Sequence, residues 1–320
     1  MANLTLLDLA KLQYNDPVVG LIEEALAAAP ELSVFPARTV PGTSYKTLVR
    51  TALPTVGFTK ANAGSTPTKS TLEQRLTELF ILRGICQIDK AIAMQSDGLG
   101  MANLEMIEAS GVVEASLRKL GKQIWYGQSS TGDTAGFAGL KDFTPKSDAT
   151  KCVDAGGTTS STGSSVYFVK FGVQAASLVF GNGTTLALSP FRDQQIVDPN
   201  DSTKWLAGRV ADLTAWSGLQ IGNANVAVRI CNLTDDSGKG LTDALLAKAL
   251  ALFKVGYQPD AIFMSRRSRR QLQVSRTVTL FGQGATKPSG GLATVAPLPD
   301  SYDNLPIYAT DQILDTDTLE

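Results

Sequence analysis

Five arginines within eleven residues form a dense concentration of positive charge in the sequence. They are Arg266, Arg267, Arg269, Arg270 and Arg276. Guanidinium groups bind phosphate and carboxylate groups through paired hydrogen bonds, so the cluster could contact a nucleic-acid backbone or form ion pairs with another subunit. A solvated helix face is the alternative interpretation. The segment 300–320 has the opposite charge, with Asp300, Asp303, Asp311, Asp315, Asp317, Glu320 and no basic residue.

The overall charge balance favours self-association over DNA binding. The chain has 29 basic and 30 acidic residues, whereas a dedicated nucleic-acid binder is usually basic because it must neutralise phosphates. Two oppositely charged patches on a near-neutral protein are instead typical of subunits that bind one another.

The residues needed for most catalytic and metal sites are missing or isolated. The sequence has no histidine, which excludes the Ser-His and Cys-His triads and most zinc and iron sites. The carboxylates Asp198, Asp201, Asp235 and Asp236 lie among Pro, Asn, Ser and Gly, so we expect solvated turns. A Ca²⁺ or Mg²⁺ site is the alternative. We therefore expect no enzyme, no catalytic residue, no metal and no cofactor.

The cysteines and lysines fit no ligand motif. Cys86, Cys152 and Cys231 are far apart and odd in number, which predicts buried reduced thiols rather than disulfides or a metal site. Lys69 is followed by Ser and Lys239 is preceded by Gly, as in a phosphate-binding loop. Neither lysine has the complete pattern of glycines and a hydroxyl that such a loop needs. No apolar stretch is long enough to cross a membrane, and residues 1–12 do not resemble a signal peptide. We expect a chain made in a reducing cytoplasm.

The first third of the chain predicts an arm and a long hairpin. Segment 3–29 has helical spacing, after which three prolines exclude helix up to Gly42. Strands are predicted over 44–58 and 70–83, separated by the polar tip 59–69, and a helix over 72–82 is the alternative interpretation. Because two strands alone are marginal in water, this hairpin needs another surface to lie on.

The rest of the chain predicts one long helix and mixed elements. Segment 102–125 has an apolar stripe of Met106, Val113, Leu117, Leu120 and Ile124. Segment 151–234 is rich in strand patterns, with a hairpin turn at 181–183. Thr242 and Ser265 are expected to cap helices reaching residues 253 and 276, and strands are expected at 261–264 and 305–310.

The order of these parts resembles one protein family. The segments that carry the resemblance are FPARTVPGTSYKTLVRTALPTVGF (35–58), EMIEASGVVEASLRKLGKQIWYG (105–127), GFAGL (136–140), DAIFMSRRSRRQL (260–272) and LPIYATDQI (305–313). Together they resemble the major capsid proteins of tailed bacteriophages, which have the Hong Kong 97-type fold. The resemblance implies an α+β protein with an N-terminal arm, an extended hairpin (the E-loop), a peripheral (P) domain with a long spine helix, and an axial (A) domain.

The resemblance also implies a domain organisation. We expect the N-arm at 1–43, the E-loop at 44–84, the P domain with its spine helix at 85–140, a β-rich part at 141–234 that belongs mainly to the P-domain sheet, and the A domain at 235–320. In the commonest pattern of the family the A-domain elements follow the spine helix directly, so this order is a departure from it. The start at Met1 leaves no long helical scaffold ahead of the arm, which implies a separate scaffolding protein or assembly without one.

The function implied is that of a structural subunit. Such a subunit assembles with itself into hexamers and pentamers of an icosahedral phage head, in the bacterial cytoplasm, around double-stranded DNA that it contacts non-specifically. A portal protein, a scaffolding protein and a decoration protein are the further partners. The expected intersubunit contacts are Lys60, Lys69, Arg266, Arg267, Arg269 and Arg270. Some capsids of this fold cross-link a hairpin lysine to a neighbour, but we expect no cross-link here.

Two other classes stay open on sequence alone. One is a carboxylate-based hydrolase, which needs two acidic groups in one cleft although nothing in the spacing requires that. The other is a virion accessory protein. Particle size separates the three, because a capsid subunit forms shells or capsomers.

Overall fold

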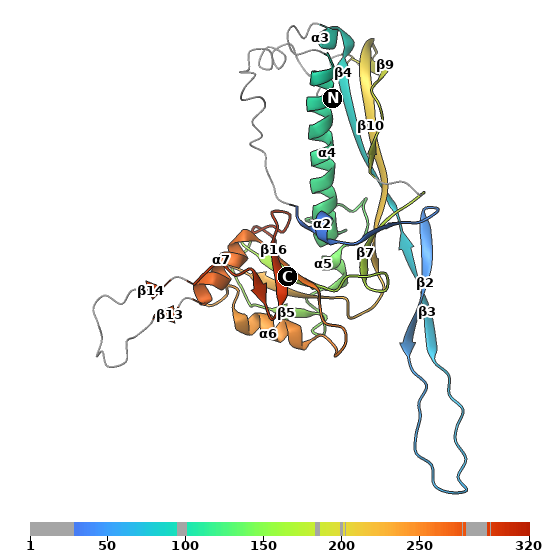
Figure 1. Ribbon diagram of the computed structural model, residues 1–320, viewed down its shortest axis with the longest axis vertical. Coiled ribbons are helices and arrows are strands. Elements are labelled where there is room, and N and C mark those ends of the chain that lie inside the picture. The colour runs from blue at the N-terminus through green and yellow to red at the C-terminus, as the bar shows by residue number, and fades with distance from the viewer. Residues whose placement is uncertain are drawn as a thin grey trace.

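The computed structural model describes residues 29–94, 101–182, 186–198, 201, 203–276, 278–279, 293–294 and 296–320. The helices are α2 (Glu31–Val34), α3 (Lys90–Met94), α4 (Met101–Tyr126), α5 (Leu140–Phe143), α6 (Asp243–Ala251) and α7 (Arg266–Ser275). They combine with strands in two main sheets and a projecting hairpin, so the predicted α+β class is confirmed (Figure 1). Nearly all of the expected helical segment 3–29 lies outside the described residues.

The first main sheet is built around one long strand, β10 (Trp205–Ile221). Ten of its residues pair antiparallel with β4 (Phe80–Asp89) along one edge. Its other edge pairs with β7 (Ala176–Phe180), β8 (Ala187–Leu188) and β9 (Arg192–Val197) in turn, and β1 (Ala37–Thr39) extends the sheet beyond β7. Both β7 and β8 pair with β10 and not with each other, so the predicted hairpin at 181–183 is wrong.

Helix α4 covers one face of this sheet (Figure 1). Leu104, Ser116, Leu120 and Ile124 are buried on it, whereas Met106 and Leu117 of the predicted stripe are exposed. The buried side advances in steps of four residues and includes Ser116, so hydropathy alone does not reveal it. The long helix is confirmed at Met101–Tyr126, but its predicted core face is wrong in part.

The second main sheet has the order β15-β16-β12-β6-β11-β5. Its strands are β5 (Cys152–Asp154), β6 (Ser164–Val169), β11 (Ala227–Leu233), β12 (Ala261–Met264), β15 (Ser301–Tyr302) and β16 (Leu305–Ala309). Alternate side chains of β6 face opposite cores, because successive residues of a strand point to opposite sides. Phe168 packs with residues of α6 and α7, whereas Tyr167 packs with Trp125 at the end of α4.

The two sheets meet in one aromatic core at the C-terminal end of α4. Trp125 lies 4.9 Å from Phe263 of β12 and 6.0 Å from Phe35, measured between ring centroids. The same cluster contains Leu178 of β7 and Leu219 of β10, which belong to the first sheet. The end of the long helix therefore fixes how the two sheets are joined.

The expected β-rich part 141–234 contributes strands to both sheets. β7 to β10 lie in the first sheet, whereas β5, β6 and β11 lie in the second with β12 and β16 from the later chain. The reason is long-range pairing, since β6 lies between β11 and β12 through hydrogen bonds that no local pattern records.

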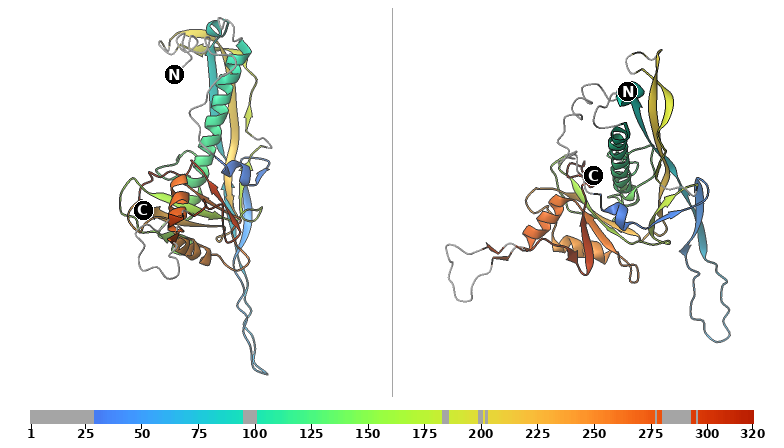
Figure 2. Two further views of the ribbon diagram at one scale, coloured as in Figure 1. Left: turned by 60° about the vertical axis from the view of Figure 1, so that its left-hand side comes forward. Right: turned by 45° about the horizontal axis from the view of Figure 1, so that its top comes forward.

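A hairpin of β2 (Ser44–Ala52) and β3 (Thr71–Glu78) projects from the body in every view (Figures 1 and 2). Its register runs from Ser44 opposite Glu78 to Ala52 opposite Thr71. The predicted strand 70–83 is interrupted at the buried Leu79, after which β4 enters the first sheet. A smaller pair, β13 (Val278–Thr279) and β14 (Ala293–Thr294), lies on the opposite side of the molecule.

Candidate functional site

The arginine cluster lies on α7, which begins directly after the buried strand β12. Ser265 caps the helix as predicted, because its Oγ accepts a hydrogen bond from the backbone N–H of Ser268 at 3.2 Å. Ser268 and Leu272 are fully buried and hold one side of the helix against the second sheet. Four of the arginines lie in the first five positions of the helix, and the fifth, Arg276, is its C-cap.

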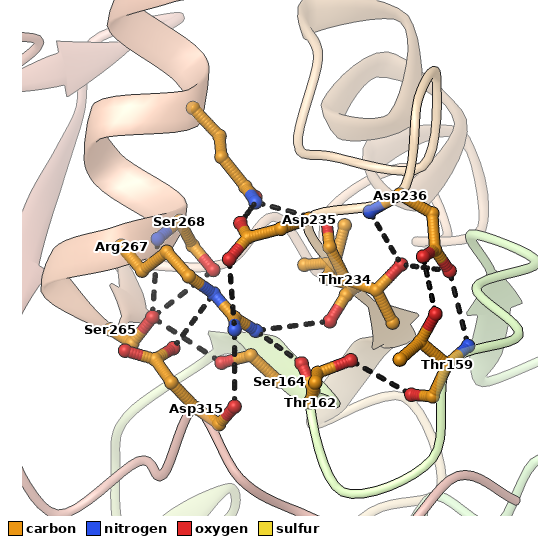
Figure 3. Close-up of polar contacts among 12 residues, drawn as sticks. Thr159, Thr162, Ser164, Thr234, Asp235, Asp236, Ser265, Arg267, Ser268 and Asp315 are labelled. Carbon is orange, nitrogen blue, oxygen red and sulfur yellow. Dashed lines mark hydrogen bonds and ion pairs between the residues drawn. The ribbon is translucent and has the colours of Figure 1, made fainter.

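Arg267 is held by its own chain (Figure 3). Its Nη2 donates to the carbonyl oxygens of Thr162 at 2.6 Å and Leu233 at 3.3 Å, and its Nη1 donates to the carbonyl oxygen of Asp315 at 3.1 Å. The carboxylates of Asp315 and Asp235 lie 3.4 and 3.6 Å from the guanidinium. Arg267 thus joins the loop before β6, the end of β11 and the segment after β16. With these acceptors in its own chain, it has few N–H groups left to donate to another subunit.

Two further arginines find partners in the acidic segment 300–320. Arg266 Nε lies 2.6 Å from Asp311 Oδ1, although the arginine side chain is largely exposed. Arg269 forms an ion pair with Asp300 and donates from Nε to the carbonyl oxygen of Pro299 at 2.9 Å. The two oppositely charged patches recognised in the sequence therefore meet within one chain.

Arg276 and Arg270 complete the set in different ways. Arg276 makes a two-pronged ion pair with Asp243, the first residue of α6, at 2.6 and 2.9 Å, and so joins α6 to α7. Arg270 is exposed and donates to Gln273 Oε1 at 3.0 Å. It makes no ion pair with the described part of the chain, and it lines a surface hollow beside Asp235 and Val274. Arg270 is the arginine of this helix that has most freedom to bind another molecule.

Asp236 accepts several hydrogen bonds from the neighbouring loop and is not simply solvated (Figure 3). The backbone N–H groups of Thr158 and Thr159 donate to its Oδ2 at 3.0 and 3.1 Å, and the Thr234 hydroxyl donates at 2.9 Å. The hydrogen bond from the Thr159 hydroxyl is the largest cause that lowers the pKa of Asp236, and the three hydrogen bonds just described act in the same direction. The expected solvated turn is therefore a hydrogen-bonded anchor between the loop before β6 and the end of β11.

The hairpin lysines lie far from the arginines in the same chain. Lys60 and Lys69 are exposed in the tip between β2 and β3, and neither forms an ion pair with the described residues. Figure 1 shows the hairpin and α7 on different sides of the molecule. The six residues expected at subunit contacts therefore form two separate regions of one chain.

The hairpin, which the sequence predicts to need another surface to lie on, carries an exposed apolar face. Leu48, Leu72 and Leu76 are 66%, 51% and 52% exposed. The register places Leu48 opposite Gln74 and Leu76 opposite Lys46, so all three leucines point to the same side of the ribbon. The parity of Leu72 and Leu76 was visible in the sequence, but their exposure follows only from the hairpin leaving the body.

Two exposed isoleucines lie on the first sheet, on either side of the exposed Arg83. Ile81 and Ile85 of β4 are exposed, and they alternate with Gly84 and Cys86, which face α4. Trp216 pairs with Ile81 across the sheet and is half-buried. The face of the sheet opposite the helix therefore carries uncovered isoleucines.

Ligand and membrane features were not found in the described part of the chain. Among these residues, no group of three or more His, Cys, Asp or Glu side chains is arranged to hold a metal ion. No helix there is long and apolar enough to cross a membrane.

Residues 33–319 match the family described as "Major capsid protein GP7". The chain belongs to this family. It is a structural subunit of a bacteriophage capsid, as the resemblance implied. No curated protein sequence matches this capsid subunit.

Solved structures show the fold of this subunit. It is similar to a chain in the structure of bacteriophage Epsilon15, with a TM-score of 0.73 and 18% sequence identity over 99% of this chain and 97% of that one. It is also similar to a chain of the capsid of Myoviridae phage XM1, with a TM-score of 0.50 and 12% identity over 70% and 98% of the two chains. The fold is therefore the Hong Kong 97-type capsid fold.

Proposed function

We propose that this capsid subunit forms the hexamers and pentamers of an icosahedral head around double-stranded DNA. The observation that carries the proposal is the β2–β3 hairpin, whose exposed Leu48, Leu72 and Leu76 share one side without any core of their own. Contiguous exposed apolar groups of this kind mark interaction sites. The hairpin lies on a neighbouring subunit, and the exposed Ile81 and Ile85 of that neighbour offer apolar side chains for its leucines to contact.

The domain organisation we propose follows the two sheets. The N-arm is 1–43, and the hairpin E-loop lies within 44–84. The P domain contains α4 and the sheet around β10, whereas the A domain contains the sheet from β15 to β5 with α6 and α7. The expected division at 234 is thus replaced by one in which the chain passes from one sheet to the other more than once.

We infer that the contact residues act in two groups. Lys60 and Lys69 at the hairpin tip reach a neighbouring subunit as solvated charges, without a covalent cross-link. On α7, Arg270 bridges to a neighbour, supported at the helix surface by Arg266. Arg267 and Arg269 act indirectly, because their bonds within the chain fix the shape of this surface.

The further partners follow from the same proposal. A portal protein and a scaffolding protein act with the subunit during assembly in the bacterial cytoplasm, and a decoration protein binds the finished shell. Packaged DNA is contacted non-specifically, in keeping with the balanced charge of 29 basic and 30 acidic residues.

The experiment that tests the proposal replaces the hairpin leucines. A Leu48→Ser and Leu76→Ser double variant is expected to keep its circular-dichroism spectrum and unfolding midpoint but to form no shells in light scattering and negative-stain microscopy. Deletion of 59–69 is expected to have the same result. The control is Val255→Ser, which removes an even more exposed apolar side chain beyond α6 and should leave assembly unchanged. Shells of normal size from the leucine variant would overturn the assignment.

A further inference from the structure

Two of the three cysteines lie side by side in the second sheet. The Sγ atoms of Cys152 on β5 and Cys231 on β11 are 3.2 Å apart, although the residues are 79 positions apart in sequence. β5 pairs parallel with β11 so that Cys152 is opposite Arg229 and Asp154 is opposite Cys231. Both cysteines therefore point to the same side of the sheet, and both are free thiols.

The surroundings of the pair favour reaction at Cys152. Cys231 is completely buried, whereas Cys152 keeps 6% of its surface exposed on the edge strand of the sheet. The hydrogen bond between the two thiols lowers the pKa of the Cys152 thiol, with burial acting against it and the charge of Arg229 in support. The thiolate form is the nucleophile in thiol oxidation, so Cys152 is the more reactive of the two.

Cys86 provides a contrast within the same chain. It lies in the first sheet without a second cysteine nearby, and burial, together with the charges of Glu108 and Glu105, raises the pKa of its thiol to about 11. A buried thiol of this kind is inert.

We propose that Cys152 and Cys231 form a dithiol site that a small hydroperoxide converts into an intramolecular disulfide between β5 and β11. Only a small oxidant fits, because the pair is almost completely enclosed. The resulting bond closes a long loop and fixes an edge strand that otherwise pairs through three residues. If the proposed function is correct, a subunit that leaves a reducing cytoplasm in the virion meets such oxidants only after assembly.

The disulfide forms in two steps, through a sulfenic acid on Cys152. The Cys152 thiolate attacks one peroxide oxygen, the O–O bond breaks, and the departing oxygen takes up a proton, leaving Cys152 as a sulfenic acid. The sulfur of Cys231 then attacks the sulfur of Cys152, the S–O bond breaks, and the hydroxide leaves as water with the Cys231 proton. The two thiols lose two electrons, which reduce the hydroperoxide to water and, for an alkyl peroxide, an alcohol.

The test uses the folded full-length chain and hydrogen peroxide. After treatment, free thiols are blocked with N-ethylmaleimide, and the protein is digested without reductant for peptide mass spectrometry. The expected product is a peptide pair linked through Cys152 and Cys231, with Cys86 still carrying the maleimide after the protein is denatured. The melting temperature should rise on oxidation and return to its starting value with dithiothreitol.

Variants separate this site from general oxidation. Cys152→Ser and Cys231→Ser should each abolish both the linked peptide and the rise in melting temperature, whereas Cys86→Ser should retain both. Should either serine variant fail to fold, the wild-type and Cys86→Ser results still decide the question. A linked peptide that forms only in urea, or Cys86 reacting as fast as Cys152 in the folded chain, would overturn the proposal. Shell formation is measured separately, so failure here leaves the proposed assembly function untouched.

Discussion

Gly84 on β4 lies directly against Val112 on α4. A Cβ atom placed on Gly84 would be 2.9 Å from Cγ1 of Val112 and 3.5 Å from Oγ of Ser116. The absence of a side chain at Gly84 is therefore what lets the long helix approach the sheet.

We expect Gly84→Ala to destabilise the subunit, because the added methyl group overpacks this contact at a cost of about 1–3 kcal/mol. Urea unfolding of the unassembled subunit measures the change. The control is Gly111→Ala on the outer side of α4, where a Cβ meets nothing within 4 Å. That variant should have a free energy of unfolding about 1 kcal/mol higher than the wild type, because alanine favours helix more than glycine does. Equal effects of the two substitutions would contradict the proposed contact.

The local signals in the sequence predicted the elements around the arginines well. Ser265 and Thr242 cap α7 and α6 as expected, because capping depends on a hydroxyl only three residues from the N–H it accepts. The buried strand Ala261–Met264 was also recognised, since a short apolar run between turn residues is a local pattern.

Features that depend on distant pairing were not predicted. β10 is the longest strand of the protein's described part, yet Gly208 and Gly218 interrupt its pattern, and the β-rich character expected over 151–234 does not locate an individual strand there. Those glycines are required by close neighbours, since a Cβ at Gly218 would be 2.7 Å from Leu79. In the same way, the pairing of Arg269 with Asp300 joins two segments that the sequence showed only as opposite in charge.

A buried ion pair gives the second prediction. Lys141 Nζ lies 2.8 Å from Asp317 Oδ2, and the two side chains are 8% and 4% exposed. Asp317→Ala leaves the lysine charge buried beside only the more distant Glu320, at 3.3 Å. We expect a loss of about 3–5 kcal/mol in the free energy of unfolding, as is usual when one partner of such a pair is removed.

The control for this prediction is an exposed pair. Glu114→Ala removes the partner of Arg118 on the surface of α4 and should cost about 0.5 kcal/mol or less. Both variants are measured by urea unfolding at one salt concentration. A loss for Asp317→Ala as small as that for Glu114→Ala would show that Lys141 reaches solvent.

The third prediction concerns pH. Glu31 is completely buried beside Gly121, and burial raises the pKa of its carboxyl above the usual 4.5, with the charge of Asp311 acting in the same direction. The folded chain therefore holds this proton at a pH where the unfolded chain has lost it. The stability contributed is complete below the unfolded pKa and is lost as pH rises through the folded pKa.

Glu31→Gln should remove this dependence, because the amide cannot ionise. The variant is expected to match the wild type in acid and to exceed it in unfolding free energy at alkaline pH. Glu73→Gln, on the exposed hairpin strand β3, is the control and should leave the pH profile as in the wild type. Parallel pH profiles for Glu31→Gln and the wild type would show that Glu31 is ionised in the fold.

The last prediction isolates the intersubunit role of α7. Arg270 is the suitable position, because Arg267 and Arg269 are bound to acceptors of their own chain and changing them would disturb the fold. If Arg270 meets a carboxylate of a neighbouring subunit, Arg270→Glu places two negative charges together. The repulsion between two unit charges about 4 Å apart near a protein surface is about 4 kcal/mol. We expect a folded subunit that forms no capsomers in sedimentation and light scattering, in preparations freed of DNA by nuclease. Lys248→Glu makes the same change of charge on the exposed side of α6 and should assemble normally.

Packaged DNA is the competing partner of Arg270, since phosphate also binds guanidinium groups with paired hydrogen bonds. An Arg270→Glu subunit that builds empty shells as well as the wild type, and is defective only in retaining DNA, would assign the arginine to DNA.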